Sequence, residues 1–534
     1  MNNSRTHSGL LALCIALALT ACGGGGGGGD SGSSNVGPGV TPPSSGTYSW
    51  LLKAEGRTDN LKFALSLLHP QDTATEYLIE PASAAVTDAK LVATATVDVT
   101  TQQTGTLEPF ALVYIVGGDV RRLPLKANGA APSSRVTRAQ SSSACRFVLE
   151  AMDYAAPEQS RFIVSTAGAD GVCDTSDDGR GEVRLDATLG VVYAPITGAA
   201  PLAVLHDPAT LAPRGWLLPT QAQLWQAGSS PETYRAAGEP VTRVVQATAR
   251  SALVESARGL SVLDFGSSPL VTETVLPALN TTGWQGIGFD AQNFYAWRNG
   301  GTVASPTWSV QRISRTAPTA SQLGSGAGQV TLASMGTDVL YATVLGASNV
   351  ELRRFLKAVP GAVTLLSSGP STSSFLSVIT GAAGVHQQWR VSGLGTAAPS
   401  YVIEMVDEQG SVLFSSAAGG FSLGPAQASR VNFNSSESRN RFLFVEGYGE
   451  RFFGDAALLA YDTTTRAATR VGRLPGSAEF GADFVFANIV AGPTALAGGF
   501  ASRSIGGVVQ ASGTRVFSFE PGTANSLKTT TRQL

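Results

Sequence analysis

The chain has 534 residues, of which 14% are charged, and its formal net charge is −2. Lys/Arg and Asp/Glu residues are interspersed, so the composition offers no electrostatic case for nucleic-acid binding. The length exceeds what one ordinary compact core supports, and it fits two or three domains or one array of repeats.

The N-terminus has the features of an export signal. Arg5 precedes a mostly apolar run from Leu10 to Leu19, which is about half of a membrane-spanning helix but suits the core of a secretory signal. The run ends in Leu19-Thr20-Ala21-Cys22, which resembles the lipobox of bacterial lipoproteins. The resemblance implies a signal peptide over residues 1–21 and a diacylglycerol group on the thiol of Cys22.

The segment after the signal is predicted to be a tether. Residues 22–46 comprise the lipidated cysteine and a Gly/Ser/Pro-rich linker of the flexible kind. Gly23 stands where aspartate would favour inner-membrane retention under the enterobacterial sorting rule, so the resemblance implies the outer membrane. No later stretch is apolar enough to span a membrane, and the lipid is therefore the only predicted anchor. Residues 47–534 are expected to form the folded body.

The body has the pattern of an all-β protein. Strand-like segments of five to eight residues, rich in Val, Thr, Ser, Ala and Gly, recur between Gly and Pro residues. Less regular hairpins are expected in the first half at FALVYIVGGDVRRLPL, GVVYAPITGAAPLAVL and GLSVLDFGSSPLVTETVL.

The second half contains a repeated unit. A hairpin recurs, often after a further strand such as NFYAWRN or DVLYATV, and equivalent points lie 42, 50, 56 and 58 residues apart at Ile313, Phe355, Met405, Tyr461 and Phe519. This period is about one four-stranded blade. The eight hairpin candidates predict a β-propeller of seven or eight blades, and the pattern resembles β-propeller proteins in general. Tandem β-sandwich domains are the alternative.

The cysteine count predicts one disulfide. Cys14 leaves with the signal and Cys22 carries the lipid, so the folded body holds only Cys145 and Cys173. Exported proteins fold in an oxidising compartment, and we therefore expect these two cysteines to pair.

Four aspartates surround the second of these cysteines in TAGADGVCDTSDDGRGE. Carboxylates this close repel each other unless solvent or a hard cation such as calcium separates them. The stretch resembles the G-x-D-G…T-x-D-D calcium loops of some bacterial exported proteins, but position 12 from the first aspartate is Gly181 where an EF-hand has glutamate. Two interpretations stay open, a solvated acidic turn and a structural calcium site with the ligands Asp170, Asp174, Asp177 and Asp178.

No catalytic or cofactor-binding motif emerges from the sequence. Gly420 to Gly424 match G-x-S-x-G, but that chemistry needs a following helix and a later histidine, and the last histidine is His386. The three histidines that follow the signal, His69, His206 and His386, are far apart in sequence, and each is expected to be a surface or locally hydrogen-bonded residue. Six tryptophans are interpreted as packing residues rather than a binding groove: Trp216, Trp225, Trp284, Trp297, Trp308 and Trp389.

The sequence favours a non-enzymatic lipoprotein of the cell envelope. We expect a rigid, tethered propeller that serves as a binding or scaffold module for a protein or an envelope polysaccharide, with no required cofactor. Function inferred from a fold is an association only. The alternative is an enzyme, such as a glycan-active lyase or hydrolase, whose site is assembled from loops of several blades. A deep central pocket with facing carboxylates or a buried histidine would favour that alternative.

Overall fold

A computed structural model describes most of the chain from residue 49 onward. The described residues are 49–57, 60–68, 76–80, 86–104, 108–124, 137–138, 143–185, 191–226, 228–235, 239–276, 283–316, 319–380, 384–396, 400–417, 441–445, 456–462, 466–474, 484–491, 496–502, 513–519, 524 and 528–533. Cys22 with residues 1–46, His69 and Gly420–Gly424 lie outside them, so the predictions made for these residues stay predictions.

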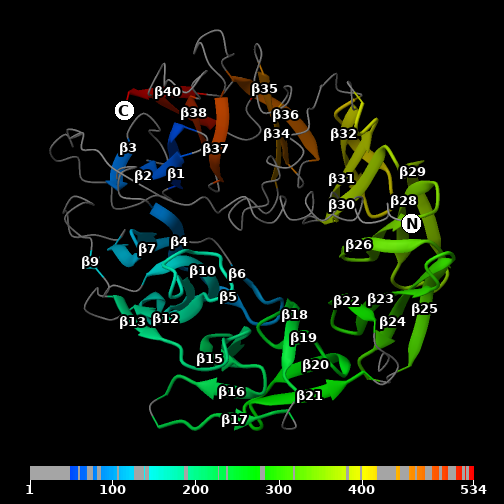
Figure 1. Ribbon diagram of the computed structural model, residues 1–534, viewed down its shortest axis with the longest axis horizontal. Coiled ribbons are helices and arrows are strands. Elements are labelled where there is room, and N and C mark those ends of the chain that lie inside the picture. The colour runs from blue at the N-terminus through cyan, green and yellow to red at the C-terminus, as the bar shows by residue number, and fades with distance from the viewer. Residues whose placement is uncertain are drawn as a thin grey trace.

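The described residues form ten antiparallel sheets of three or four strands and one two-stranded ribbon. Figure 1 shows the sheets arranged as a ring. The first sheets contain β1 (Ser49–Arg57), β2 (Asn60–Leu68) and β3 (Glu76–Glu80); β4 (Val86–Thr94), β7 (Glu108–Val116), β8 (Asp119–Pro124) and β9 (Thr137–Arg138); and β10 (Ala144–Ala151), β11 (Arg161–Thr166), β12 (Gly179–Leu185) and β13 (Val191–Pro195). The ribbon pairs β5 (Val97–Asp98) with β6 (Gln103–Thr104).

Four further sheets follow along the chain. They contain β14 (Ala203–His206), β15 (Pro213–Leu217), β16 (Gln221–Leu224) and β17 (Glu232–Thr233); β18 (Val241–Ala247), β19 (Ser251–Ser256), β20 (Gly259–Phe265) and β21 (Val271–Val275); β22 (Trp284–Phe289), β23 (Asn293–Gly301), β24 (Pro306–Ser314) and β25 (Ala320–Ala327); and β26 (Gln329–Met335), β27 (Val339–Leu345), β28 (Asn349–Leu356) and β29 (Val363–Pro370).

The last three sheets return to the start of the chain. They contain β30 (Ser374–Thr380), β31 (Val385–Ser392), β32 (Ser400–Asp407) and β33 (Val412–Ser415); β34 (Arg441–Val445), β35 (Ala456–Asp462) and β36 (Ala467–Leu474); and β37 (Phe484–Ala491), β38 (Leu496–Ser502), β39 (Gly513–Phe519) and β40 (Lys528–Gln533). β1 contacts β37 and β38, so the two ends of the folded body lie side by side (Figure 1).

The predicted all-β propeller is confirmed. Strands follow chain order within each four-stranded sheet, and the first strands of consecutive sheets, β18, β22, β26 and β30, contact one another. Eight sheets have four strands, and the three-stranded sheets β1–β3 and β34–β36 come in addition to them. Among the described residues, one short 3-10 turn, Pro157–Gln159, lies between strands, and none of their helices is long and apolar enough to cross a membrane.

The core consists of apolar layers between neighbouring sheets. The second strand of a sheet lies in the middle of two such layers, so it is buried on both faces and reads as a continuous apolar run. In β27, Val339 to Val344 are all buried. In the layer before that sheet, Trp308 meets Phe355 edge-to-face at 5.8 Å between ring centroids, a favourable aromatic geometry.

The repeat found in the second half of the sequence marks strands that occupy equivalent positions in their sheets. Ile313, Phe355, Met405 and Phe519 lie in the third strands β24, β28, β32 and β39, each paired with the fourth strand of its sheet. The segment GVVYAPITGAAPLAVL is different, because its two strands β13 and β14 belong to different sheets. The prediction of a hairpin there was wrong, since two short strands around a Gly/Pro-rich turn look alike within and between blades.

Candidate functional site

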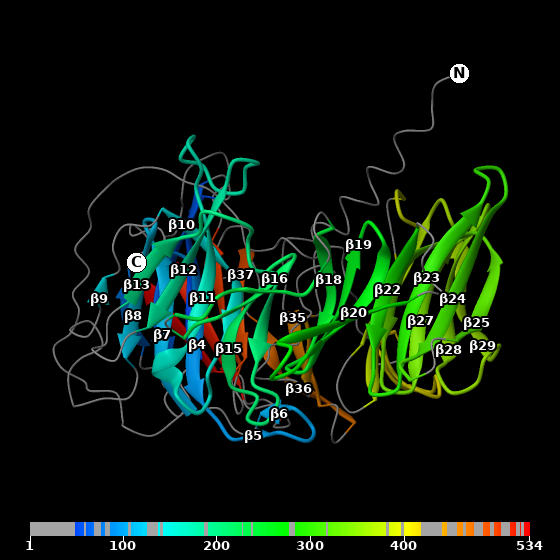
Figure 2. The same cartoon turned by 90° about the horizontal axis from the view of Figure 1, so that it is seen from below.

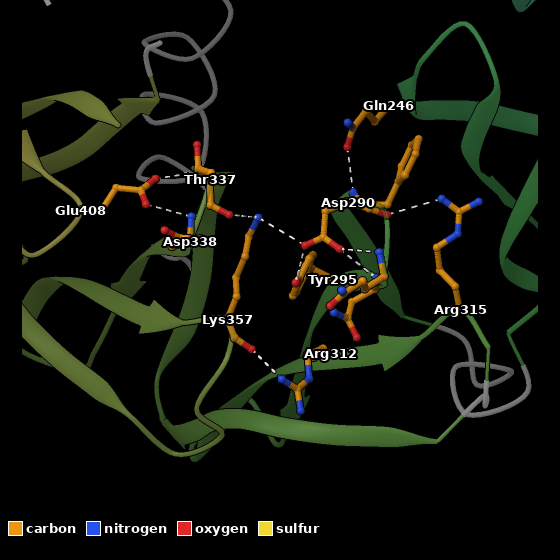
Figure 3. A network of polar contacts seen from close by, with 12 residues as sticks. Gln246, Asp290, Tyr295, Arg312, Arg315, Thr337, Asp338, Lys357 and Glu408 are labelled. Carbon is orange, nitrogen blue, oxygen red and sulfur yellow. Dashed lines mark hydrogen bonds and ion pairs between the residues drawn. The ribbon is translucent and has the colours of Figure 1, made fainter. Parts of the chain in front are cut away.

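A network of buried and half-buried charged side chains joins four consecutive sheets, and Figure 3 shows part of it from close by. It lies where the first strand of a sheet turns into the second and the third turns into the fourth. Arg315, Lys357 and Glu408 each directly follow the third strand of their sheet. Each of the three contacts the turn between the first two strands of its own sheet, or a residue next to that turn. Each also contacts the preceding sheet. We call these three the bridge residues and the whole network the latch.

The Glu408 carboxylate caps a turn of the preceding sheet. The backbone N–H groups of Thr337 and Asp338, between β26 and β27, donate to its two oxygens at 2.6 and 2.9 Å. His386 Nε2 lies 3.3 Å from the same carboxylate, and the two side chains are 0% and 7% exposed. Burial lowers the pKa of His386 from its usual 6.5, although the Glu408 charge opposes this shift. A neutral imidazole therefore faces the Glu408 carboxylate at the boundary between two sheets.

Lys357 bridges the same turn to the sheet before it. Its Nζ donates to the Thr337 carbonyl oxygen at 2.8 Å and lies 3.6 Å from Asp290 Oδ2. The ammonium also lies 4.9 Å from the centroid of the Tyr295 ring, within cation–π range. Burial lowers the pKa of Lys357, and the Asp290 charge works against that shift.

Asp290 is held by the turn that it begins. Its Oδ1 accepts the N–H groups of Gln292 and Asn293 at 2.9 and 2.8 Å, and its Oδ2 accepts the Tyr295 hydroxyl at 2.6 Å. Burial alone would raise the pKa of Asp290, but these hydrogen bonds and the Lys357 charge hold it below its ordinary value. Asp290 is therefore ionised at neutral pH and balances the buried ammonium.

Arg315 repeats the arrangement one sheet earlier. Its Nη2 lies 2.8 Å from Asp264 Oδ1 and donates to Ser251 Oγ at 3.3 Å, both in the preceding sheet. Its guanidinium carbon lies 5.7 and 5.3 Å from the ring centroids of Phe289 and Phe294. The cation thus joins two sheets while its flat face covers aromatic rings.

The contacts of the latch join neighbouring sheets. A general acid or base must come within hydrogen-bond reach of a substrate, whereas His386 is enclosed by its own and the neighbouring sheet. Glu408 and Lys357 are engaged by protein groups on both sides of a sheet boundary. Hydrogen bonds between buried polar groups stiffen and specify a structure, and the bonds of Glu408 and Lys357 do so across the sheet boundary.

The latch has a signal in the sequence, but no motif marks it. The repeat aligned Ile313, Phe355 and Met405, and a bridge residue follows two or three positions after each. These residues are arginine, lysine and glutamate, so they share no residue type. Their common feature is a charged side chain at the end of an apolar third strand.

The acidic loop, Gly168 to Asp178, connects β11 to β12. It therefore lies at the other end of its sheet from the connections β10–β11 and β12–β13. Cys145 and Cys173 form the expected disulfide, with their Cα atoms 5.7 Å apart. Arg146 Nη2 lies 2.8 Å from Asp174 Oδ1, and these side chains are 46% and 44% exposed. One covalent bond and one ion pair therefore fasten this loop to β10.

The aspartates of the acidic loop serve the loop itself. Asp178 accepts the N–H groups of Asp174 and Thr175, and Asp170 accepts that of Val172 at 2.8 Å. The Thr175 hydroxyl donates to Asp177 at 2.6 Å and lowers the pKa of that carboxyl. Within the described part of the chain, no group of three or more His, Cys, Asp or Glu side chains is placed to hold a metal ion. Calcium binding by the four aspartates stays a prediction that this arrangement does not support.

The other residues singled out in the sequence are accounted for by packing. His206 Nδ1 lies 2.8 Å from the Leu211 carbonyl oxygen, and burial lowers the pKa of His206. Five of the six tryptophans are buried, and the half-buried Trp225 meets Trp216 edge-to-face at 5.2 Å. These observations agree with local hydrogen bonding for the histidine and packing for the tryptophans.

No family model and no curated protein matches the chain. Among solved structures, an oligogalacturonate lyase in complex with manganese is similar with a TM-score of 0.30 and 10% identity, over 59% of this chain and 74% of that one. A structure from a study of two prolyl endopeptidases has a TM-score of 0.29 and 10% identity, over 89% of this chain and 55% of that one. The Nup133 β-propeller domain of Vanderwaltozyma polyspora has a TM-score of 0.25 and 7% identity, over 57% and 95%.

Proposed function

We propose that the protein is an outer-membrane lipoprotein whose propeller is a non-enzymatic binding or scaffold module for a protein or a polysaccharide of the cell envelope. The anchor is Cys22, at the end of the lipobox-like segment, and residues 23–46 are the tether. The ring supplies a rigid body, because its buried charges are used to fasten one sheet to the next.

One observation carries the proposal, namely that the acidic loop is exposed and also firmly braced. Val172 at its tip is 54% exposed, while the disulfide of Cys173 and the Arg146–Asp174 ion pair hold the loop to β10. A surface whose shape is set before binding loses less conformational entropy on association. The enzyme alternative requires an accessible acid–base pair, and the buried pair His386–Glu408 is enclosed.

The anchor is tested with a Cys22→Ser variant. Wild-type protein should incorporate radiolabelled palmitate and sediment with membranes, whereas the variant should be unlabelled and soluble after export. A variant that stays in the membrane fraction with the mass of the wild type contradicts the anchor.

The binding role is tested by a photo-crosslinking amino acid placed at Val172 in living cells. A matched control replaces Leu365 on β29, which is 50% exposed and lies on a different sheet. We expect a discrete cross-linked product from position 172 and none from position 365. Products from position 365 alone, or none from either position, contradict a partner at the acidic loop.

A further inference from the structure

The β5–β6 ribbon departs from the repeat. It is inserted between β4 and β7, the first two strands of their sheet, and pairs only Val97 with Thr104 and Asp98 with Gln103. Figure 1 shows it running past β10 toward β18, and Figure 2 shows it at one end of the ring. An isolated two-stranded hairpin is marginally stable in water, so the position of this ribbon depends on its attachments to other sheets.

Hydrogen bonds attach the ribbon to two other sheets. The Ala95 N–H donates to the Tyr154 carbonyl oxygen at 3.2 Å, in the loop between β10 and β11. Farther along, Arg250 Nη2 donates to the Val99 carbonyl oxygen at 2.7 Å. Arg250 lies in the turn between β18 and β19, so the ribbon passes the β10–β13 and β14–β17 sheets before it reaches this contact.

The ribbon is organised internally but covers little apolar surface. Asp98 Oδ1 accepts the Thr100 N–H at 2.8 Å, and the Asp98 carbonyl oxygen accepts the Gln102 N–H at 2.8 Å. The side chains from Asp98 to Gln102 are exposed, and Val99 itself is 38% exposed. Segments with few buried apolar contacts occupy the low end of local stability.

We propose that the β5–β6 ribbon is a strap that docks on the β18–β21 sheet through Arg250 and releases as one unit while the ring stays folded. The turn of the ribbon keeps its two strands together. The Ala95–Tyr154 hydrogen bond attaches the ribbon at one end, and the Arg250–Val99 hydrogen bond attaches it at the other. Release returns the Arg250 donor to solvent next to Ser251, which belongs to the latch. The docked strap therefore occupies the Nη2 donor of Arg250.

The test is hydrogen–deuterium exchange of the exported protein, read by mass spectrometry on peptides over residues 95–104. Arg250→Ala removes the charged donor, and we expect these amides to exchange roughly tenfold faster, while peptides over β18–β21 exchange as in the wild type. Arg250→Lys keeps a charged donor but lacks the planar fork of the guanidinium, and it should give an intermediate rate. The matched control is Arg243→Ala in β18, which removes an exposed arginine paired with Glu255 and should leave the ribbon unchanged.

Two outcomes overturn the strap. Unchanged exchange of residues 95–104 in Arg250→Ala means that Arg250 does not hold the ribbon. Faster exchange of the ribbon together with β18–β21 means that the ribbon does not release as a unit separate from the sheet.

Discussion

The latch and the acidic loop are both clusters of charged residues on strand connections, but they use charge in opposite ways. Latch members come from four sheets, and the side chains of Glu408 and Lys357 are each 7% exposed. The acidic loop draws its aspartates from nine consecutive residues and stays in solvent, tied to its own sheet by Cys173 and Arg146. The buried cluster holds sheets together, and the exposed cluster shapes one loop.

A high density of charged residues in a sequence segment therefore says little about how much those residues contribute to the stability of the fold. Ion pairs in solvent contribute little, because water competes and salt screens them. When a buried carboxylate with three partners is removed, the charged or polar groups that it contacted are left without a partner in the interior. Substitutions in the two regions should therefore differ in how much they lower the free energy of unfolding.

The largest effect is expected from Glu408→Ala. The substitution leaves the N–H groups of Thr337 and Asp338 without their acceptor, and it removes one partner of His386. We expect the free energy of unfolding in urea to fall by about 3–5 kcal/mol. Glu408→Gln keeps an oxygen acceptor and should lose less. Equal losses in the two variants would show that the carboxylate does not cap the turn.

A smaller loss is expected from Gly336→Ala. A Cβ atom at this position would lie 2.7 Å from His386 Cε1 and 2.9 Å from Glu408 Oε1, so the sheet boundary must shift to admit it. We expect a loss of about 1–3 kcal/mol by urea unfolding. Gly198→Ala is the control, because nothing lies within 4 Å of its Cβ position. A Gly336 variant as stable as the control would contradict the close packing of the latch.

The latch should also make stability depend on pH. Burial places the pKa of folded His386 below its usual 6.5, so the unfolded chain binds a proton more readily in that range. Stability therefore falls as pH drops below 6.5 and levels off below the folded pKa. His386→Gln should flatten this part of the urea-unfolding profile. An unchanged slope in the variant would remove His386 from the explanation.

The smallest effect is expected in the acidic loop. Asp174→Asn keeps the shape of the side chain and removes its charge from Arg146, in a pair that is 46% and 44% exposed. We expect a change below about 1 kcal/mol, smaller still at high salt. Unfolding curves at two salt concentrations measure it. A loss comparable with that of Glu408→Ala would erase the distinction between the two regions.

The fold was predictable from the sequence to a larger extent than the site. Apolar strands at a sustained period revealed the third strands that contain Ile313 and Phe355, because their burial imposes a visible pattern. The short strands β14 and β17, of four and two residues, are too brief for such a pattern. The disulfide followed from elimination, since the body holds two cysteines. The latch could not be predicted from any short segment of the sequence, because its contacts join residues such as Thr337 and Glu408 that are 71 positions apart.

The central claim is that buried charges of the latch fasten one sheet to the next. A double-mutant cycle between Asp290→Asn and Lys357→Met measures this directly, because Asp290 and Lys357 lie in neighbouring sheets with 3.6 Å between Oδ2 and Nζ. We predict a coupling free energy of about 0.5–3 kcal/mol from urea unfolding of the wild type, both single variants and the double variant. Strictly additive losses, with a coupling of zero, would contradict the account.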